Sequence, residues 1–305
     1  NDQDLSLAYS QGVAAPVREI VKDPGAVNKY TIKGNLVAVI TDGSAVLGLG
    51  NVGPLAAKPV MEGKAVLFKR FAGIDVFNIE LDTQDVDEIV NTIKNIAPTF
   101  GGINLEDISA PRCFEIEKRL IDELDIPVFH DDQHGTAIIV AAGLLNALEI
   151  QEKNFKEAKI VCAGAGSAGI ATLNLLLELG FSKDNILLVD RNGVVSTKSK
   201  NLSKEKLTFA ADTDKTTLSD AINGSDVFIG VARGNLVTQE MVKSMAKKPI
   251  IFALSNPDPE ISPVDVYACR DDVLMATGRS DYQYQLNNVL GFPYIFRGAL
   301  NANSK

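Results

Sequence analysis

The sequence predicts an α/β protein of two domains: an N-terminal α/β domain over residues 1–130 and a C-terminal Rossmann-type domain, with a doubly wound parallel sheet, over residues 131–305. Three observations support this fold class. Short apolar runs alternate with amphipathic helical patterns through the first half of the chain. A glycine-rich turn follows an apolar strand and opens a helix in the second half. The 305 residues, 46% of them hydrophobic, suffice for two separate cores.

Composition narrows the range of partners and compartments. A formal charge of -9 and a pI near 4.9 argue against a nucleic-acid partner, although a small anionic ligand stays compatible with a locally basic site. The three cysteines lack CxxC spacing and are too few for a disulfide framework, which indicates a cytoplasmic protein. No apolar run reaches the ~18 residues of a membrane span. The chain begins without Met and stops at Lys305 with no closing element, so we expect it to be truncated at both ends.

The first 50 residues predict one hairpin. Residues 2–13 show no clean helical or strand period, and from this stretch alone Tyr9 is most simply a packing residue. An Asp-Gly pair at residues 42–43 separates two β-rich runs, which is the pattern of a two-residue hairpin turn.

The next segment alternates strands and helices. Apolar runs at 74–81, 102–105 and 126–129 predict three strands. Apolar residues at i, i+3, i+4 spacing from Val86 mark one connecting helix, and Pro111 opens the other. This βαβ order predicts a parallel sheet.

Two pairs of neighbouring carboxylates follow the second and third of these strands. They are Glu106-Asp107 and Asp131-Asp132, and strand C-termini face the ligand crevice of an open α/β sheet. Like charges this close raise each other's pKa and need a cation or hydrogen-bond donors. If the pairs converge, their hard oxygen ligands suit Mg²⁺ or Mn²⁺. The alternative is helix N-capping by Asp107 and Asp132.

Lys64 also allows two interpretations. It stands just after a glycine, at the edge of the apolar run 59–68. Most lysines in such a place are solvated surface groups. A lysine held against an apolar wall has a lowered pKa instead and can act as a base.

A glycine-rich loop is the strongest local motif. The apolar strand 159–163 runs directly into a turn, which a helix follows, and the turn consists of Gly164, Ala165, Gly166, Ser167, Ala168 and Gly169. Glycines there allow a tight turn and let a pyrophosphate reach the helix N-terminus. The order predicts dinucleotide binding, and the alternative is a strand-to-helix turn that binds no ligand.

The strand after this helix, 185–189, ends on Asp190. An acid at that place accepts a hydrogen bond from a ribose 2′-hydroxyl and repels a 2′-phosphate, so we expect NAD in preference to NADP. The separation of 26 residues between Gly164 and Asp190 exceeds the usual ~20. Three later apolar runs complete the same sheet, at 227–231, 250–254 and 273–276.

Together these residues resemble the small bacterial type of malic enzyme over almost the whole chain. The segments that carry the resemblance are Asp4 to Tyr9, Thr41-Asp42-Gly43 with Gly48-Leu49-Gly50, Pro59 to Lys64, Gly101 to Glu115, Phe129 to Ala137, Gly164 to Gly169, Ser255-Asn256-Pro257 and Asn287-Asn288. The resemblance implies oxidative decarboxylation of (S)-malate to pyruvate and CO₂, with NAD (NADP being allowed), Mg²⁺ or Mn²⁺, and a homodimer.

The resemblance also implies a role for each matching residue. Tyr9 matches the catalytic general acid and Lys64 the general base. The metal-ligand positions are Glu106, Asp107 and Asp132, with Asp131 beside the metal or in the Lys64 network. Residues 165–168 match the pyrophosphate loop, and the amides near nicotinamide and substrate match Asn256 and Asn288.

The sequence departs from the family pattern at two places, and two other functions remain as alternatives. Ser10-Gln11 stands in place of Thr-Pro, and Ser44-Ala45 stands where larger relatives carry an arginine for the substrate carboxylate. A metal-independent hydroxy- or amino-acid dehydrogenase predicts turnover without a divalent cation. A catalytically inert nucleotide-binding module predicts NAD binding without turnover.

Overall fold

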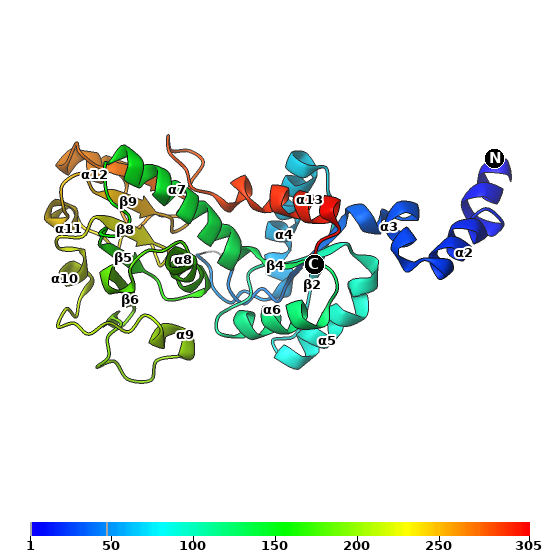
Figure 1. Cartoon of the computed structure of the whole chain (residues 1–305), viewed down its shortest axis with the longest axis horizontal. Helices are drawn as coiled ribbons and strands as arrows, with labels where there is room; N and C mark the ends of the chain where they lie inside the picture. Colours follow the sequence, from blue (N-terminus) through cyan, green and yellow to red (C-terminus); the bar gives the residue numbers. More distant parts are fainter. Residues whose placement is uncertain (1, 47) are drawn as a thin grey trace.

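The computed structural model describes residues 2–46 and 48–305 and contains two β-sheets side by side (Figure 1). The first sheet has four parallel strands in the order β2-β1-β3-β4. The second has six, in the order β10-β9-β8-β5-β6-β7, and all pairs are parallel except β6 with β7. Because the chain winds outward from β5 on both sides, this sheet is doubly wound. The predicted fold class is confirmed.

The elements have the following bounds. The strands are β1 (Leu36–Thr41), β2 (Asp75–Glu80), β3 (Gly102–Leu105), β4 (Val128–His130), β5 (Ile160–Ala163), β6 (Ile186–Asp190), β7 (Gly193–Val194), β8 (Val227–Gly230), β9 (Ile250–Ala253) and β10 (Leu274–Thr277). The α-helices are α1 (Asp2–Leu5), α2 (Ala14–Lys22), α3 (Val27–Tyr30), α4 (Pro54–Ala72), α5 (Val86–Ile96), α6 (Arg112–Glu123), α7 (Thr136–Ile150), α8 (Ser167–Glu178), α9 (Lys204–Leu207), α10 (Leu218–Ile222), α11 (Gln239–Ser244), α12 (Pro263–Cys269) and α13 (Phe292–Ala302). Shorter helical turns are η1 (Ser6–Ser10), η2 (Pro24–Ala26), η3 (Ile32–Asn35), η4 (Ala97–Thr99), η5 (Asp131–Gly135), η6 (Lys183–Asn185) and η7 (Asn288–Leu290).

The first sheet is covered on both faces. Alternate residues of β1 belong to two different cores: Ile40 packs with residues of α5 and α6, whereas Val39 packs with residues of α4 and α13. Every residue of β1 is buried, as expected for an inner parallel strand.

The hairpin predicted at Asp42-Gly43 is wrong. β1 pairs in parallel with β2 and β3, and the turn leads away from the sheet to an isolated bridge between Val46 and Gly50. Gly43 has a φ of +66°, and a Cβ on it would lie 2.2 Å from the carbonyl oxygen of Gly53. The Asp-Gly pair therefore makes a tight turn, as the local signal indicated, but long-range pairing decides which strand lies beside β1.

The second sheet is also covered on both faces. Cys162 of β5 packs with residues of α7 and α8, and its neighbours Val161 and Ala163 pack with residues of α10, α11 and α12. Among the described residues, no helix combines the length and apolar character needed to cross a membrane.

The end of the described chain returns to the first sheet. Helix α13 lies beside α4 (Figure 1), and the rings of Phe292 and Phe296 pack edge-on against Phe68 with centroids 4.8 and 5.3 Å away. Arg297 donates a 2.6 Å hydrogen bond to the side chain of Asn35. The division between residues 130 and 131 stays a prediction, and α13 belongs to the core of the first sheet.

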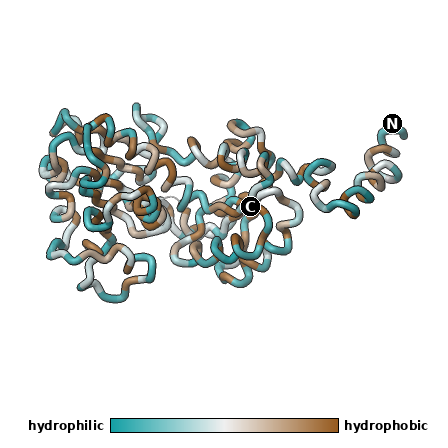
Figure 2. The backbone as a smooth tube through the Cα atoms, in the orientation of Figure 1, coloured by the Kyte–Doolittle hydropathy of each residue, from teal (hydrophilic) through white to brown (hydrophobic). Residues whose placement is uncertain are grey.

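An arm formed by α1, η1 and α2 extends away from both sheets (Figure 1). No described residue of α1, α2 or α3 is buried. Figure 2 shows hydrophobic positions along the arm, and its exposed large hydrophobic side chains are Leu5, Leu7, Tyr9, Val13, Val17 and Val21.

Candidate active site

Strand register brings the two carboxylate pairs together. Ile40, Leu105 and His130 lie side by side in β1, β3 and β4. The residues that follow β3 and β4 therefore leave the sheet at the same edge. One oxygen from each of Glu106, Asp107 and Asp132 lies within 4.8 Å of the others, a spacing that one divalent cation could bridge.

These carboxylates are costly to hold without a cation. Burial, then the charge of Asp132, raises the pKa of Asp107 to about 8. Burial also raises the pKa of Glu106 well above its usual range, although Lys64 opposes the shift. Oδ2 of Asp107 is buried and has no hydrogen-bond partner among the described residues. The donor set, with its orphaned oxygen, fits Mg²⁺ or Mn²⁺.

The alternative role of helix capping is not observed. Helix α6 and turn η5 begin without a side-chain cap. Instead, Oδ2 of Asp132 accepts a 2.8 Å hydrogen bond from the backbone N–H of Asp107. Asp107 has a φ of +53°, a strained conformation for a non-glycine residue, and strain of this kind is typical of functional sites.

Lys64 is buried inside this cluster and is not a surface group. It lies in α4, with Nζ 2.5 Å from Oδ2 of Asp131 and 2.9 Å from Oε1 of Glu106. Its Nζ also lies 4.2 Å from the ring centroid of Phe292. Burial lowers the pKa of Lys64, but Asp131 and Glu106 outweigh burial and hold the pKa above its ordinary value. The expected lowering of this pKa is therefore wrong, because the wall beside Lys64 is acidic as well as aromatic.

Asp131 joins the end of the chain to the cluster. Its Oδ2 accepts a 2.6 Å hydrogen bond from Nδ2 of Asn288 in η7, which brings Asn288 beside the carboxylate cluster. Gly135 packs against the same carboxylate, because a Cβ there would lie 1.9 Å from Oδ1 of Asp131. Asp131 and Gly135 are the first and last residues of η5, one of two π-helical turns among the described residues, and such turns often mark functional sites.

Two supporting residues were not identified from the sequence. Glu117 on α6 accepts hydrogen bonds from the backbone N–H of His130 and the side chain of Gln133, and lies 2.8 Å from Nε2 of His134. Asn104 donates a 2.9 Å hydrogen bond to Oε2 of Glu106. Asn104 and Glu106 are two positions apart at the end of β3, so their side chains lie on the same face of the strand. This spacing was the only local signal that Asn104 contacts Glu106.

Tyr9 and Asn256 lie outside the cluster. Tyr9 belongs to η1 on the extended arm, and 75% of its surface is exposed. Asn256 follows β9, where a Cβ on Gly48 would lie 2.6 Å from its carbonyl oxygen. The loop that contains Gly48, in the first half of the chain, thus contacts the second half at Asn256.

The glycines of the predicted dinucleotide loop are of two kinds: Gly164 and Gly169 are closely packed, whereas Gly166 faces open space. A Cβ on Gly164 would lie 2.5 Å from the carbonyl oxygen of Val231, and one on Gly169 would lie 1.8 Å from that of Gly164. A Cβ on Gly166 would meet no atom within 4 Å. Free space in front of Gly166, at the N-terminus of α8, fits a phosphate group.

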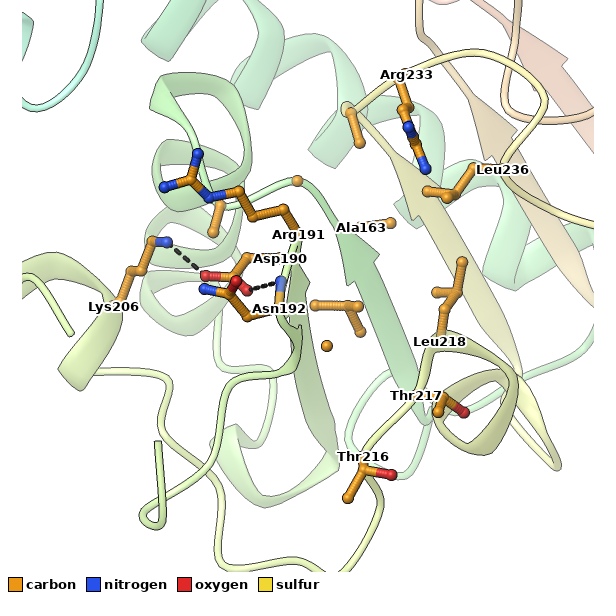
Figure 3. A pocket seen from close by; sticks show the side chains of 15 residues that line it. Ala163, Asp190, Arg191, Asn192, Lys206, Thr216, Thr217, Leu218, Arg233 and Leu236 are labelled. Atoms are coloured by element: carbon orange, nitrogen blue, oxygen red, sulfur yellow. Dashed lines mark hydrogen bonds and ion pairs between the residues drawn. The ribbon is translucent and has the colours of Figure 1, made fainter. Parts of the chain in front are cut away.

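A cavity of about 750 Å³ lies beside this loop (Figure 3). Its lining includes Ala165 and Asp190 of the predicted dinucleotide site, together with Arg233 from the loop after β8. Oδ2 of Asp190 lies 2.6 Å from Nζ of Lys206, a contact that the sequence did not indicate.

Two family models match the chain. Residues 1–121 match "Malic enzyme, N-terminal domain", and residues 133–305 match "Malic enzyme, NAD binding domain". An NADP-dependent malic enzyme of Halomonas elongata is 58% identical over 302 residues, which are 99% of this chain and 72% of that relative. An NADP-dependent malic enzyme of Escherichia coli is 56% identical, and an NAD-dependent malic enzyme of Rhizobium meliloti is 55% identical.

Coverage differs between these relatives. The matches take in 99% and 100% of this chain but 40% of the length of the E. coli and R. meliloti proteins. The crystal structure of an NAD-dependent malic enzyme from Thermotoga maritima superposes with a TM-score of 0.95 at 47% identity, covering 100% of this chain and 82% of that one. With two family models spanning nearly all of its length, the chain belongs to the malic enzyme family.

Proposed function

We propose that this chain oxidises and decarboxylates (S)-malate to pyruvate and CO₂, with NAD or NADP as the hydride acceptor and Mg²⁺ or Mn²⁺ as the metal. The cluster of Glu106, Asp107 and Asp132 around Lys64 is the observation that carries this proposal. A dehydrogenase that only transfers hydride has no need for three converging carboxylates, two of them buried.

Each residue of the cluster has a distinct task. Glu106, Asp107 and Asp132 would hold the divalent cation. When bound, the dinucleotide would supply a hydride acceptor for C2 of malate, and the cation would supply positive charge for the negative charge that loss of CO₂ leaves on the product. Lys64 acts in its neutral form, which takes the proton of the C2 hydroxyl; a cation on Glu106 would offset one of the two carboxylates that raise the Lys64 pKa. Asp131 accepts a hydrogen bond from Nζ of Lys64 and from Asn288, and so positions the amine.

The loop from Gly164 to Gly169 would hold the dinucleotide. The free space in front of Gly166 would take its pyrophosphate, and the cavity beside Asp190 would take its adenosine. Asn256 and Asn288 are the amides near nicotinamide and substrate. The proposed division lies between residues 130 and 131, at the end of β4, and α13 returns from the second part to the core of the first sheet.

Tyr9 acts as the general acid in a homodimer. The arm that carries Tyr9 extends away from the sheets of its own chain (Figure 1). Tyr9 of one chain would therefore reach the Lys64 site of a second chain. The exposed apolar side chains of the arm give such a partner a surface to bury. We place the enzyme in the cytoplasm, because Cys113, Cys162 and Cys269 are all free.

The test is the absorbance of reduced nicotinamide with malate, Mn²⁺ and either NAD or NADP, with and without a chelator, combined with detection of CO₂. The proposal expects nucleotide reduction and CO₂ release that both stop with chelator. Chelator-resistant reduction without CO₂ would favour the plain dehydrogenase. Nucleotide binding without any turnover would favour the inert module.

A further inference from the structure

A buried glutamate joins two loops at the carboxyl edge of the second sheet. Glu260 lies between β9 and α12 and has no exposed surface. Its Oε1 accepts a 3.0 Å hydrogen bond from the backbone N–H of Ala232, in the loop after β8. Its Oε2 accepts a 3.1 Å hydrogen bond from the backbone N–H of Ser255, in the loop after β9. One carboxyl group therefore holds both loops.

The two loops leave the sheet at the same level. Strands β8 and β9 are parallel neighbours with Gly230 beside Ala253 at their ends, and each N–H that Glu260 binds lies two residues further on. Gly230 also makes room for the carboxyl group, because a Cβ on it would lie 2.4 Å from Cδ of Glu260. Two N–H groups and a glycine without a side chain thus surround this carboxyl group.

A carboxyl group is costly to keep in this place. Burial raises the pKa of Glu260 above its ordinary value, although the N–H groups of Ala232 and Ser255 oppose the rise. An apolar side chain of similar size would fill the same volume without this desolvation cost, but it could not accept two hydrogen bonds. The carboxyl group is therefore suited to fixing the two loops rather than to filling the core.

Each loop carries a part of the proposed dinucleotide site. Ala232 lines the cavity beside the glycine-rich loop. Asn256, the expected amide near nicotinamide, directly follows Ser255 in the chain. Its Nδ2 is confined, since it lies 3.5 Å from the carbonyl oxygen of Leu254 and 3.1 Å from the place of a Cβ on Gly278. A shift of Ser255 would move this amide.

We infer that Glu260 is a positioning residue for hydride transfer, which ties the loop after β9 to the loop after β8 and so fixes Asn256 against the nicotinamide. The inference rests on the proposed function for the role of Asn256. Glu260 is buried and acts through Asn256 alone. Alignment of the reacting groups matters, because a misplacement of about 1 Å can cost roughly 10²-fold in rate.

The test uses Glu260→Gln, which has the same shape. The amide oxygen can accept from only one of the two N–H groups, and the NH₂ group faces the other. Gly230→Ala is the second variant, because its methyl group displaces the carboxyl group without changing Glu260. Glu157→Gln is the matched control, since Glu157 is an exposed glutamate in the same half of the chain. Thermal unfolding establishes that each variant is folded.

Binding is measured without turnover. NADH is titrated with its nicotinamide fluorescence as the signal, and ADP-ribose, which lacks nicotinamide, is titrated by calorimetry. NADPH and 2′-phospho-ADP-ribose replace them if the chain prefers NADP. We expect Glu260→Gln and Gly230→Ala to weaken NADH roughly tenfold while ADP-ribose changes less than about threefold, and Glu157→Gln to match the wild type. Equal losses for both ligands would show a general structural role and overturn the inference.

Turnover shows whether Glu260 acts through Asn256. With malate and saturating dinucleotide, Glu260→Gln should lower kcat roughly 10- to 100-fold, whereas Mn²⁺-dependent CO₂ release from added oxaloacetate, which needs no hydride transfer, should change less than about threefold. Asn256→Ala should also lower kcat, and the double variant should be no slower than Asn256→Ala alone. Losses that multiply in the double variant, or an unchanged kcat in Glu260→Gln, would overturn the inference.

The two measurements separate this inference from the proposed function. A wild-type chain that never releases CO₂ from malate would refute malate decarboxylation, yet a selective loss of NADH over ADP-ribose in Glu260→Gln would still support the positioning role. Normal malate decarboxylation by both the wild type and Glu260→Gln would refute the positioning role alone.

Discussion

Without a divalent cation, Asp107 should make the protein less stable as pH rises. The pKa of Asp107 is about 8 in the folded chain against an ordinary 3.8, with burial as the main cause and Asp132 next. Between these values the folded state holds a proton that the unfolded state has lost. The free energy of unfolding therefore decreases with rising pH until about pH 8. At about 1.4 kcal/mol per pKa unit, the loss between pH 6 and pH 8 is about 2 kcal/mol.

The Asp107→Asn variant isolates this contribution. An amide of the same shape cannot titrate, so the variant should lack this part of the pH dependence. Thermal unfolding followed by circular dichroism, with chelator present, measures the effect as a shift in Tm of roughly 2–4 °C for each kcal/mol. Asp122→Asn is the control, because Asp122 is an exposed aspartate on α6.

Manganese should reverse the trend in the wild type. A cation competes with the proton for Asp107, so Mn²⁺ should stabilise the wild type more at pH 8 than at pH 6. Asp107→Asn should gain much less from Mn²⁺ at either pH, because an amide is a weaker ligand for a hard cation. Identical pH dependence in the wild type and Asp107→Asn, or equal stabilisation of both by Mn²⁺, would refute the reasoning.

Three further predictions concern the reaction. Lys64→Met should lower malate oxidation at least ~10²-fold while nucleotide binding persists, since it removes the base; activity within a few-fold of wild type would exclude Lys64 from the mechanism. Gly166→Val should melt like the wild type, because its side chain meets open space, yet lose NAD(P) binding by calorimetry and keep Mn²⁺-dependent CO₂ release from added oxaloacetate. The matched Gly169→Ala change should lower Tm instead, because its Cβ would lie 1.8 Å from a carbonyl oxygen; normal nucleotide binding by Gly166→Val would contradict this division. Inactive Tyr9→Phe and Lys64→Met chains, mixed and reassociated in equal amounts, should recover about a quarter of wild-type activity if each site uses Tyr9 from one chain and Lys64 from the other; no recovery would place both residues in one chain.

The sequence predicted the parts of the site that depend on strand ends. In a parallel sheet the carboxyl ends of all strands meet at one edge, so Glu106-Asp107 and Asp131-Asp132 could be expected to converge. The loop at Gly164 was recognisable because strand, glycines and helix occur in immediate succession. Both inferences use local patterns together with one topological rule.

Features that depend on long-range contacts could not be predicted in this way. The Asp-Gly turn after β1 has the same local signal in a hairpin as in the exit from a parallel strand, and only the pairing of β1 with β2 and β3 separates the two. The raised pKa of Lys64 depends on Asp131, 67 residues away. Lys206 reaches Asp190 from a separate one-turn helix, and no periodicity marks such a contact.

Because residues 288–302 return to the first sheet, the Lys64 site can be completed only late in the synthesis of the chain. Asn288 donates to Asp131, and Phe292 lies under the ammonium group of Lys64, yet both follow the entire second sheet in sequence. During synthesis the pocket around Lys64 thus stays open until residues near 292 have left the ribosome. A fragment ending at residue 287 would expose the face of α4 that Phe292 and Phe296 cover, so part of the core of the first sheet is supplied by residues that follow the second sheet. The Asn288 amide and the Phe292 ring therefore join the Lys64 site only after the nucleotide half of the chain has been made.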